Sequence, residues 1–177
     1  ANGINAININ DGDELLEAKL VKPGEDVVLA LRSGRAIRFN EDETRNMGRN
    51  STGVRGVRLA DENDAVVGMV IIHDPEAQLL VVSENGYGKR SSIEDYRVTG
   101  RGGKGVKTMN ITDKTGLLVS IVSVTDTSND LMIITKNGIT IRTKLADIKE
   151  AGRATQGVRL IKVDSGDKIA AVTKVME

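Results

Sequence analysis

A frame of eight residues recurs three times at a fixed spacing of 52 residues, and it constrains the fold more than any other feature of the chain. The copies occupy residues 48–55, 100–107 and 152–159, and each reads Gly-Arg-x-x-x-Gly-Val followed by Lys or Arg. A period of this length indicates an array of similar units that bury their faces against one another. We therefore divide the chain into repeats over residues 23–74, 75–126 and 127–177, with residues 1–22 as the tail of an earlier repeat.

Each repeat is predicted to contain four short strands. Alternating β-branched and apolar residues on either side of a short turn indicate a hairpin, and Asn-Gly at two of the three turns favours a type I′ turn. A second pair of strands follows the Gly-Arg frame. The predicted strands cover residues 27–31, 35–39, 54–59 and 65–72; 79–83, 87–91, 106–111 and 117–124; and 131–135, 139–143, 158–163 and 169–175. Four strands per period are typical of propeller blades, so we expect an all-β, propeller-like array of about three and a half repeats.

The formal net charge is zero, but the charges are segregated along the sequence. Three equivalent windows, 32–58, 84–110 and 136–162, hold 20 Lys and Arg residues against 8 Asp and Glu, whereas the remaining residues hold 5 against 17. Repeats that stack in the same orientation would place these windows on one side of the molecule. The pattern therefore predicts a continuous positive band, which suits a nucleic-acid partner.

Three alignment columns carry a cation in every repeat. They are Arg38, Arg90 and Arg142; Arg49, Arg101 and Arg153; and Arg55, Lys107 and Arg159. A row of cations and Gly-rich backbone can contact the phosphates of duplex DNA, with little sequence preference and strong salt dependence. The alternative is solvated surface charge, or pairing with the acidic column Glu43, Asp95 and Asp147.

Other motifs favour structural interpretations. Residues 100–105 match G-x-G-x-x-G, but a dinucleotide site needs a following helix, and residues 106–111 are predicted to be a strand. No Gly-Lys-Ser/Thr is present to form a Walker A loop. Residues 10–14 are acidic, but they lack the spacing of a calcium loop and indicate a hairpin turn.

The residue types needed for catalysis are sparse. His73 is the only histidine and is expected at a strand end, while Tyr87 and Tyr96 are expected to pack in the core. We therefore expect no catalytic residues, no metal and no cofactor in this chain. With only three aromatic residues, base stacking is excluded as a main binding mode. The absence of Cys and of a long apolar run or signal peptide fits a protein of the cytoplasm with no membrane partner.

Residues 46–59, 84–90 and 152–158 closely resemble the C-terminal domain of the DNA gyrase A protein. The resemblance covers essentially the whole chain. It implies a β-pinwheel, in which six four-stranded blades exchange strands and close into a disc around whose basic rim duplex DNA wraps. It also implies a bacterial, nucleoid-associated protein whose partners are gyrase B, together with the rest of gyrase A. ATP, Mg and the cleaving tyrosine belong to other domains of that ATP-dependent topoisomerase.

On this resemblance the cations of the three columns, with two neighbouring lysines, become the candidate DNA contacts. They are Arg38, Arg49, Arg55, Lys89, Arg90, Arg101, Lys104, Lys107, Arg142, Arg153 and Arg159. The family's seven-residue box, Gln-Arg-Arg-Gly-Gly-Lys-Gly, has only a degenerate copy here, because Thr99-Gly100 replaces the leading Gln-Arg. Three and a half repeats are too few for a closed disc, so we expect an excised portion of the domain.

Two alternative functions remain open on the sequence. The related C-terminal domain of topoisomerase IV would share the fold and much of the DNA contact. A propeller-like protein-interaction module would instead pair the cations with acidic groups of a protein partner, and it would show no salt-dependent binding to DNA.

Overall fold

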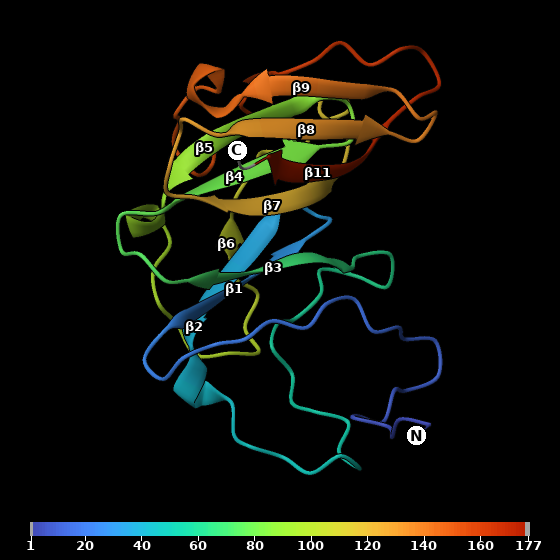
Figure 1. Cartoon of the computed structure of the whole chain (residues 1–177), viewed down its shortest axis with the longest axis vertical. Coiled ribbons are helices and arrows are strands. Elements are labelled where there is room, and N and C mark those ends of the chain that lie inside the picture. Colours follow the sequence, from blue (N-terminus) through green and yellow to red (C-terminus); the bar gives the residue numbers. More distant parts are fainter. Residues whose placement is uncertain (1, 176–177) are drawn as a thin grey trace.

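The computed structural model describes residues 2–175, in which short strands form three stacked antiparallel sheets (Figure 1). The strands are β1 (Asp26–Leu31), β2 (Arg35–Asn40), β3 (Val66–Ile72), β4 (Gln78–Ser83), β5 (Tyr87–Ser92), β6 (Val106–Lys107), β7 (Leu118–Val124), β8 (Asp130–Thr135), β9 (Thr140–Lys144), β10 (Val158–Arg159) and β11 (Ile169–Val175). Single-turn 3₁₀ helices follow β2, β5 and β9: η1 (Glu41–Glu43), η2 (Ile93–Asp95) and η3 (Leu145–Asp147). The predicted all-β, blade-like fold is confirmed.

The sheets do not coincide with the sequence repeats. The strand orders are β3-β1-β2-β6, β10-β5-β4-β7 and β11-β8-β9. Strand β6 belongs to the second repeat but pairs with β2 of the first, and β10 of the third repeat pairs with β5 of the second. Each of these repeats thus completes the sheet of the repeat before it, so neighbouring sheets are joined by hydrogen bonds as well as by packing.

The strand predicted over residues 54–59 is absent, and the third sheet has only three strands among the described residues. Residues 54–59 are the equivalents of β6 and β10, which pair with the hairpin of a preceding repeat. Among the described residues, no such hairpin lies before residue 26. Strand formation at this position therefore depends on a neighbour and not on local sequence alone.

The hairpin turns differ from the predicted type I′ geometry. The bonds from Gly86 N to Ser83 O (3.1 Å) and from Gly138 N to Thr135 O (3.0 Å) close the turns, and both glycines have positive φ. No other residue type has positive φ in the described chain, so Asn85 and Asn137 lie outside the left-handed region. The prediction was wrong in turn type, because each is a four-residue turn whose fourth residue is a left-handed glycine.

The alternating strand residues build separate apolar layers between sheets. Val28, Leu79 and Leu118 belong to the layer between the first two sheets, whereas Leu80 and Leu131 belong to the layer between the second and third. Tyr87 and Tyr96 are buried, as predicted. The second sheet is covered on both faces, and this fixes the relative placement of all three sheets.

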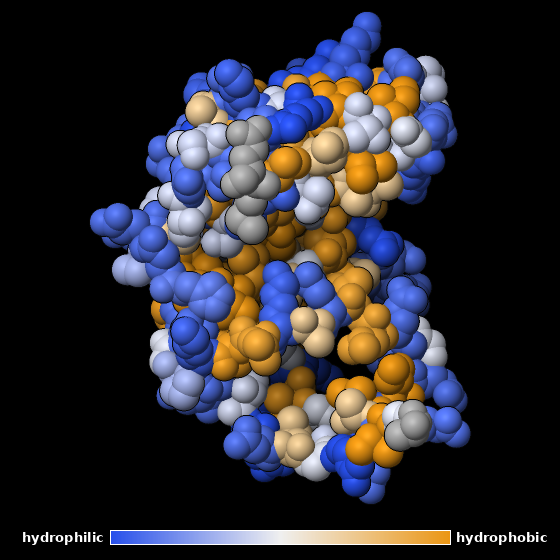
Figure 2. Space-filling view, viewed as in Figure 1, coloured by the Kyte–Doolittle hydropathy of each residue, from blue (hydrophilic) through white to orange (hydrophobic). Residues whose placement is uncertain are grey.

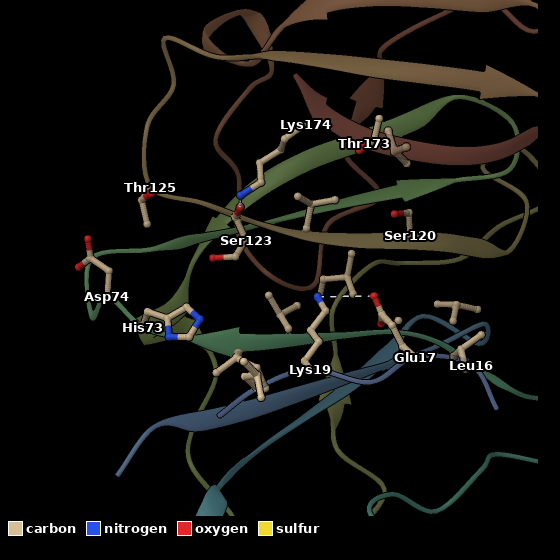
Figure 3. Close-up of a pocket in the computed structure, with 18 residues that line it drawn as sticks. Leu16, Glu17, Lys19, His73, Asp74, Ser120, Ser123, Thr125, Thr173 and Lys174 are labelled. Carbon is tan, nitrogen blue, oxygen red and sulfur yellow. Dashed lines mark hydrogen bonds and ion pairs between the residues drawn. The ribbon is translucent and has the colours of Figure 1, made fainter. Parts of the chain in front are cut away.

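A groove of about 1030 Å³ opens where β3, β7 and β11 approach residues 16–20. Figure 2 shows apolar side chains gathered in the middle of this face, with hydrophilic ones along its flanks. In the close-up of Figure 3, Lys174 reaches toward Ser123, and Lys19 and Glu17 lie on the opposite wall. Strands β3 and β7 form one edge of their sheets, and β6 and β10 form the other. We name the edge with β6 and β10 the outer side.

His73 directly follows β3, as expected, and its Nδ1 lies 2.6 Å from Glu25 Oε1. A turn is present at residues 10–14, with Asp13 N donating to Asn10 O at 3.0 Å, but no strand flanks it within residues 2–25, so the predicted hairpin does not form there. Within residues 2–175, no helix is long and apolar enough to cross a membrane.

Candidate nucleic-acid interface

The arginine of the Gly-Arg frame connects neighbouring repeats. Arg101 donates from Nε to Glu43 O at 2.8 Å and from Nη1 to Arg55 O at 3.0 Å. Arg153 makes the equivalent bonds, from Nε to Asp95 O at 3.0 Å and from Nη1 to Lys107 O at 2.5 Å. The guanidinium groups of both residues therefore hold the backbone of the preceding repeat.

The second glycine of the frame lies against the strand with which the exchanged strand pairs. Gly105 has a φ of +73°, and a Cβ there would lie 2.3 Å from Ala36 O. Gly157 has a φ of +77°, and a Cβ there would lie 2.5 Å from Gly88 O. Only glycine fits both the left-handed conformation and this close approach. Gly53 has the same conformation with no atom within 4 Å of the equivalent Cβ.

The column Arg38, Arg90 and Arg142 is engaged in contacts between strands and repeats. Arg38 donates from Nε to Asp26 Oδ2 at 2.8 Å and from Nη1 to the carbonyls of Ile93 and Tyr96 in the next repeat. Arg90 bonds Ile148 O at 2.9 Å and Gln78 Oε1 at 2.5 Å. Arg142 pairs with Asp130. The side chains that bond to Arg38 and Arg90 thus come from the adjacent strand and not from the acidic column Glu43, Asp95 and Asp147.

Lys89 has no exposed side-chain surface. Its Nζ donates to Gly152 O at 2.5 Å and also to Arg153 O. Burial and the positive charge of Arg153 lower the pKa of Lys89 to about 8, although Asp95 acts in the opposite direction. The ammonium is therefore enclosed behind the Gly-Arg loop of the third repeat, away from the position that a surface phosphate contact would need.

The remaining predicted cations lie on the outer side or its loops. Lys107 lies on β6 and Arg159 on β10, and Arg55 is their equivalent in the first repeat; all three are exposed. Arg159 lies over the ring of Tyr87, 5.7 Å from its centroid, and Lys107 Nζ is 3.4 Å from Asn110 Oδ1. Arg49 and Lys104 are exposed, and neither side chain has a polar partner among the described residues.

The structure adds a fourth cation column, Arg45, Arg97 and Lys149, which the sequence analysis missed. All three residues are exposed, and none has a side-chain hydrogen bond or ion pair within residues 2–175. The signal was present in the sequence, because the three positions are separated by the same 52 residues as the other columns.

No cluster of metal-ligating side chains is found among the described residues. The exposed cations follow successive repeats, and the charge pattern suits an extended polyanion more than a small ligand.

The sequence profile of the DNA gyrase C-terminal domain, described as a beta-propeller, matches residues 1–22, 25–73, 77–125 and 129–176. The DNA gyrase A protein of Staphylococcus epidermidis is 44% identical over 177 residues, and that of Staphylococcus aureus is 45% identical. In each case the match covers 99% of this chain and 20% of the relative. The chain thus spans about a fifth of the length of these relatives.

Two solved structures share the fold. A DNA gyrase A C-terminal domain superposes with a TM-score of 0.88 at 28% identity, covering 98% of this chain and 58% of that one. The C-terminal domain of a DNA topoisomerase IV also gives a TM-score of 0.88, at 21% identity over 96% of this chain and 52% of that one. At this lower identity the second likeness concerns the fold alone.

Proposed function

Because this chain belongs to the DNA gyrase C-terminal domain family, we propose that it binds and wraps duplex DNA along its outer side. The observation that carries this proposal is the row of exposed cations Arg55, Lys107 and Arg159, which occupy equivalent positions in successive repeats. Duplex DNA carries one negative charge per ~1.7 Å of axis, so a repeated row of cations can follow its backbone and release counterions.

The predicted contacts divide into two groups. We propose that Arg49, Arg55, Lys104, Lys107 and Arg159 contact phosphates directly, since their side chains are exposed. Arg38, Arg90, Arg101, Arg142 and Arg153 bind protein carbonyl or side-chain groups, and Lys89 is buried. For these six we propose that the positive charge contributes to the field around the outer side, while the side chains position the repeats.

Within the whole enzyme, we propose that this part of gyrase A presents a wrapped DNA segment for ATP-dependent negative supercoiling with gyrase B in the bacterial cytoplasm. The chain itself would contribute no catalytic group, and ATP and Mg would act on other domains. The relatives at 44–45% identity are gyrase A proteins, which favours gyrase over topoisomerase IV as the parent enzyme.

A salt titration tests the DNA-binding proposal. We expect the affinity for a mixed-sequence duplex to fall steeply with potassium chloride concentration, with little dependence on sequence. The triple variant Arg55→Ala, Lys107→Ala, Arg159→Ala should reduce the slope of log K against log salt by about two to three. Fluorescence anisotropy measures both quantities. Absence of binding by the unmodified chain, or an affinity that does not change with salt concentration, would contradict the proposal.

A further inference from the structure

We propose that two equivalent pockets beside the Gly-Arg loops each seat one phosphate group of the DNA backbone, with Arg97 and Lys149 as their principal contacts. The inference rests on the proposed DNA binding and assigns it two defined positions. We name these positions the first loop pocket, at the junction of repeats one and two, and the second loop pocket, at the junction of repeats two and three.

The two pockets are formed by equivalent residues of successive repeats. The first has a volume of about 220 Å³ and the second about 180 Å³. Every lining residue of the second is the 52-residue equivalent of a lining residue of the first. The shared positions are 37 and 89, 97 and 149, 99 and 151, and 103–106 and 155–158. Recurrence at both junctions argues that the hollow follows from strand exchange and is not an accident of one loop.

Arg97 and Lys149 lie on backbone segments that are hydrogen-bonded to neighbouring strands. Val98 forms a parallel bridge with Arg38, and Thr99 N donates to Arg38 O at 2.8 Å. In the second pocket, Glu150 bridges Arg90, and Ala151 N donates to Arg90 O at 2.8 Å. Arg97 and Lys149 therefore extend from backbone that is anchored to β2 and β5. Both side chains are exposed and have no protein partner among the described residues.

The loop carbonyls beside each pocket are already bonded to cations of the preceding repeat. Arg35 donates from Nε to Lys104 O at 3.3 Å and from Nη2 to Gly105 O at 3.1 Å at the first pocket. Lys89 donates to Gly152 O and Arg153 O at the second. Carbonyl oxygens repel an anion, so their engagement removes an unfavourable contact. The bonded cations also raise the local positive potential.

The two pockets differ in the number of exposed cations that could bind a phosphate group. The first contains a second exposed cation, Lys104, whereas the second has Gln156 at the same position. The carboxylate of Glu43 lies beside the first loop, with both oxygens 3.9 Å from the place that a Cβ on Gly100 would occupy. We therefore expect the first pocket to contribute two charges to phosphate binding and the second pocket one. Removing the Glu43 charge should strengthen the first pocket.

The experiment is the salt dependence of binding to a short duplex, measured for four variants of the whole chain and for one control variant. Arg97→Ala with Lys104→Ala should lower the slope of log K against log salt by about two, and Lys149→Ala should lower it by about one. Arg97→Lys should retain the slope of the unmodified chain, and Glu43→Gln should tighten binding. The control Lys19→Ala with Lys174→Ala removes the same charge from the groove of Figure 3 and should leave the slope unchanged.

Two results would overturn the inference while leaving the proposed function intact. One is an unchanged slope in Lys149→Ala together with a loss of only about one in Arg97→Ala with Lys104→Ala, which the Lys104 contact alone would give, when the unmodified chain still binds DNA. The other is an equal loss of slope in the groove control, because the effect would then reflect net charge alone. If the unmodified chain does not bind DNA, the inference and the proposed function fail together.

Discussion

Lys89 Nζ donates a hydrogen bond to Gly152 O across 2.5 Å, and this lysine has no exposed surface. Its equivalents in the other repeats are Ile37 and Ile141. The junction of the second and third repeats is therefore held by a buried ammonium at a position where the first repeat buries an isoleucine. Burying a charge is costly unless it is well bonded, and the two carbonyls offset that cost only in part.

The first prediction concerns alkaline pH. Burial lowers the pKa of Lys89 to about 8 from its ordinary 10.5. The unfolded chain therefore binds more protons than the folded chain between these values, so the Lys89 contribution to stability rises with pH across that window. From neutral pH to about pH 9.5 we expect this contribution to the free energy of unfolding to increase by about 2 kcal/mol.

Urea denaturation at each pH measures this change. The variant Lys89→Ile carries the residue found at the equivalent positions of the other two repeats. In this variant the increase in the free energy of unfolding with pH should disappear. Tyr96 has a raised pKa because of burial, so its contribution falls only at higher pH, once the tyrosine of the unfolded chain ionises. Identical pH profiles for the variant and the unmodified chain would contradict the role assigned to Lys89.

The second prediction separates structural members of one column from the member that we propose to contact DNA. Arg101→Ala and Arg153→Ala should each lower the free energy of unfolding by about 1–2 kcal/mol, because each removes two bonds to carbonyls of another repeat. Arg49→Ala should change stability by less than about 0.5 kcal/mol, since its side chain is exposed and has no partner within residues 2–175. Denaturant titration compares the three variants directly, and equal losses would refute the distinction.

The third prediction concerns strand exchange. Gly105→Ala should destabilise the chain by about 3 kcal/mol or more, because the methyl group meets Ala36 O at 2.3 Å in addition to the left-handed strain. Gly53→Ala carries the same strain at a φ of +93° without any close atom, so we expect a loss of only about 1 kcal/mol. Hydrogen exchange at Val106 and Ala36 should report opening of the β2–β6 pairing in the first variant and not in the second. A similar loss of stability in both variants would mean that the close contact carries no cost.

Much of the fold could be predicted from the sequence, because strand alternation and glycine positions are local signals. The hairpins β1–β2, β4–β5 and β8–β9 lie where the pattern of apolar residues predicted them. The strands of the outer side were harder to predict from the sequence. Strands β6 and β10 are only two residues long, and residues 54–59 form no strand. Their pairing depends on a hairpin from another repeat, and no local pattern carries that information.

The candidate site was predicted less completely. The repeated cations were readable, yet the sequence could not separate Arg55 and Lys107, which are exposed, from Arg101, which binds the carbonyl of Glu43 at a separation of 58 residues. The sequence shows only that an arginine is present, and it does not show whether its guanidinium is solvated on a loop or joins two repeats. Only the packing of repeats decides which role each takes.

The sequence by itself determined the repeat, the strand-rich fold and the concentration of positive charge in equivalent windows, because each is a property of spacing and residue type. The tertiary structure alone decided that the Gly-Arg frames of the second and third repeats complete their neighbours' sheets, and that Lys89 is buried while Arg97 is exposed. The physical reason is that exposure and hydrogen-bond partners are set by segments distant in sequence, which only folding brings together.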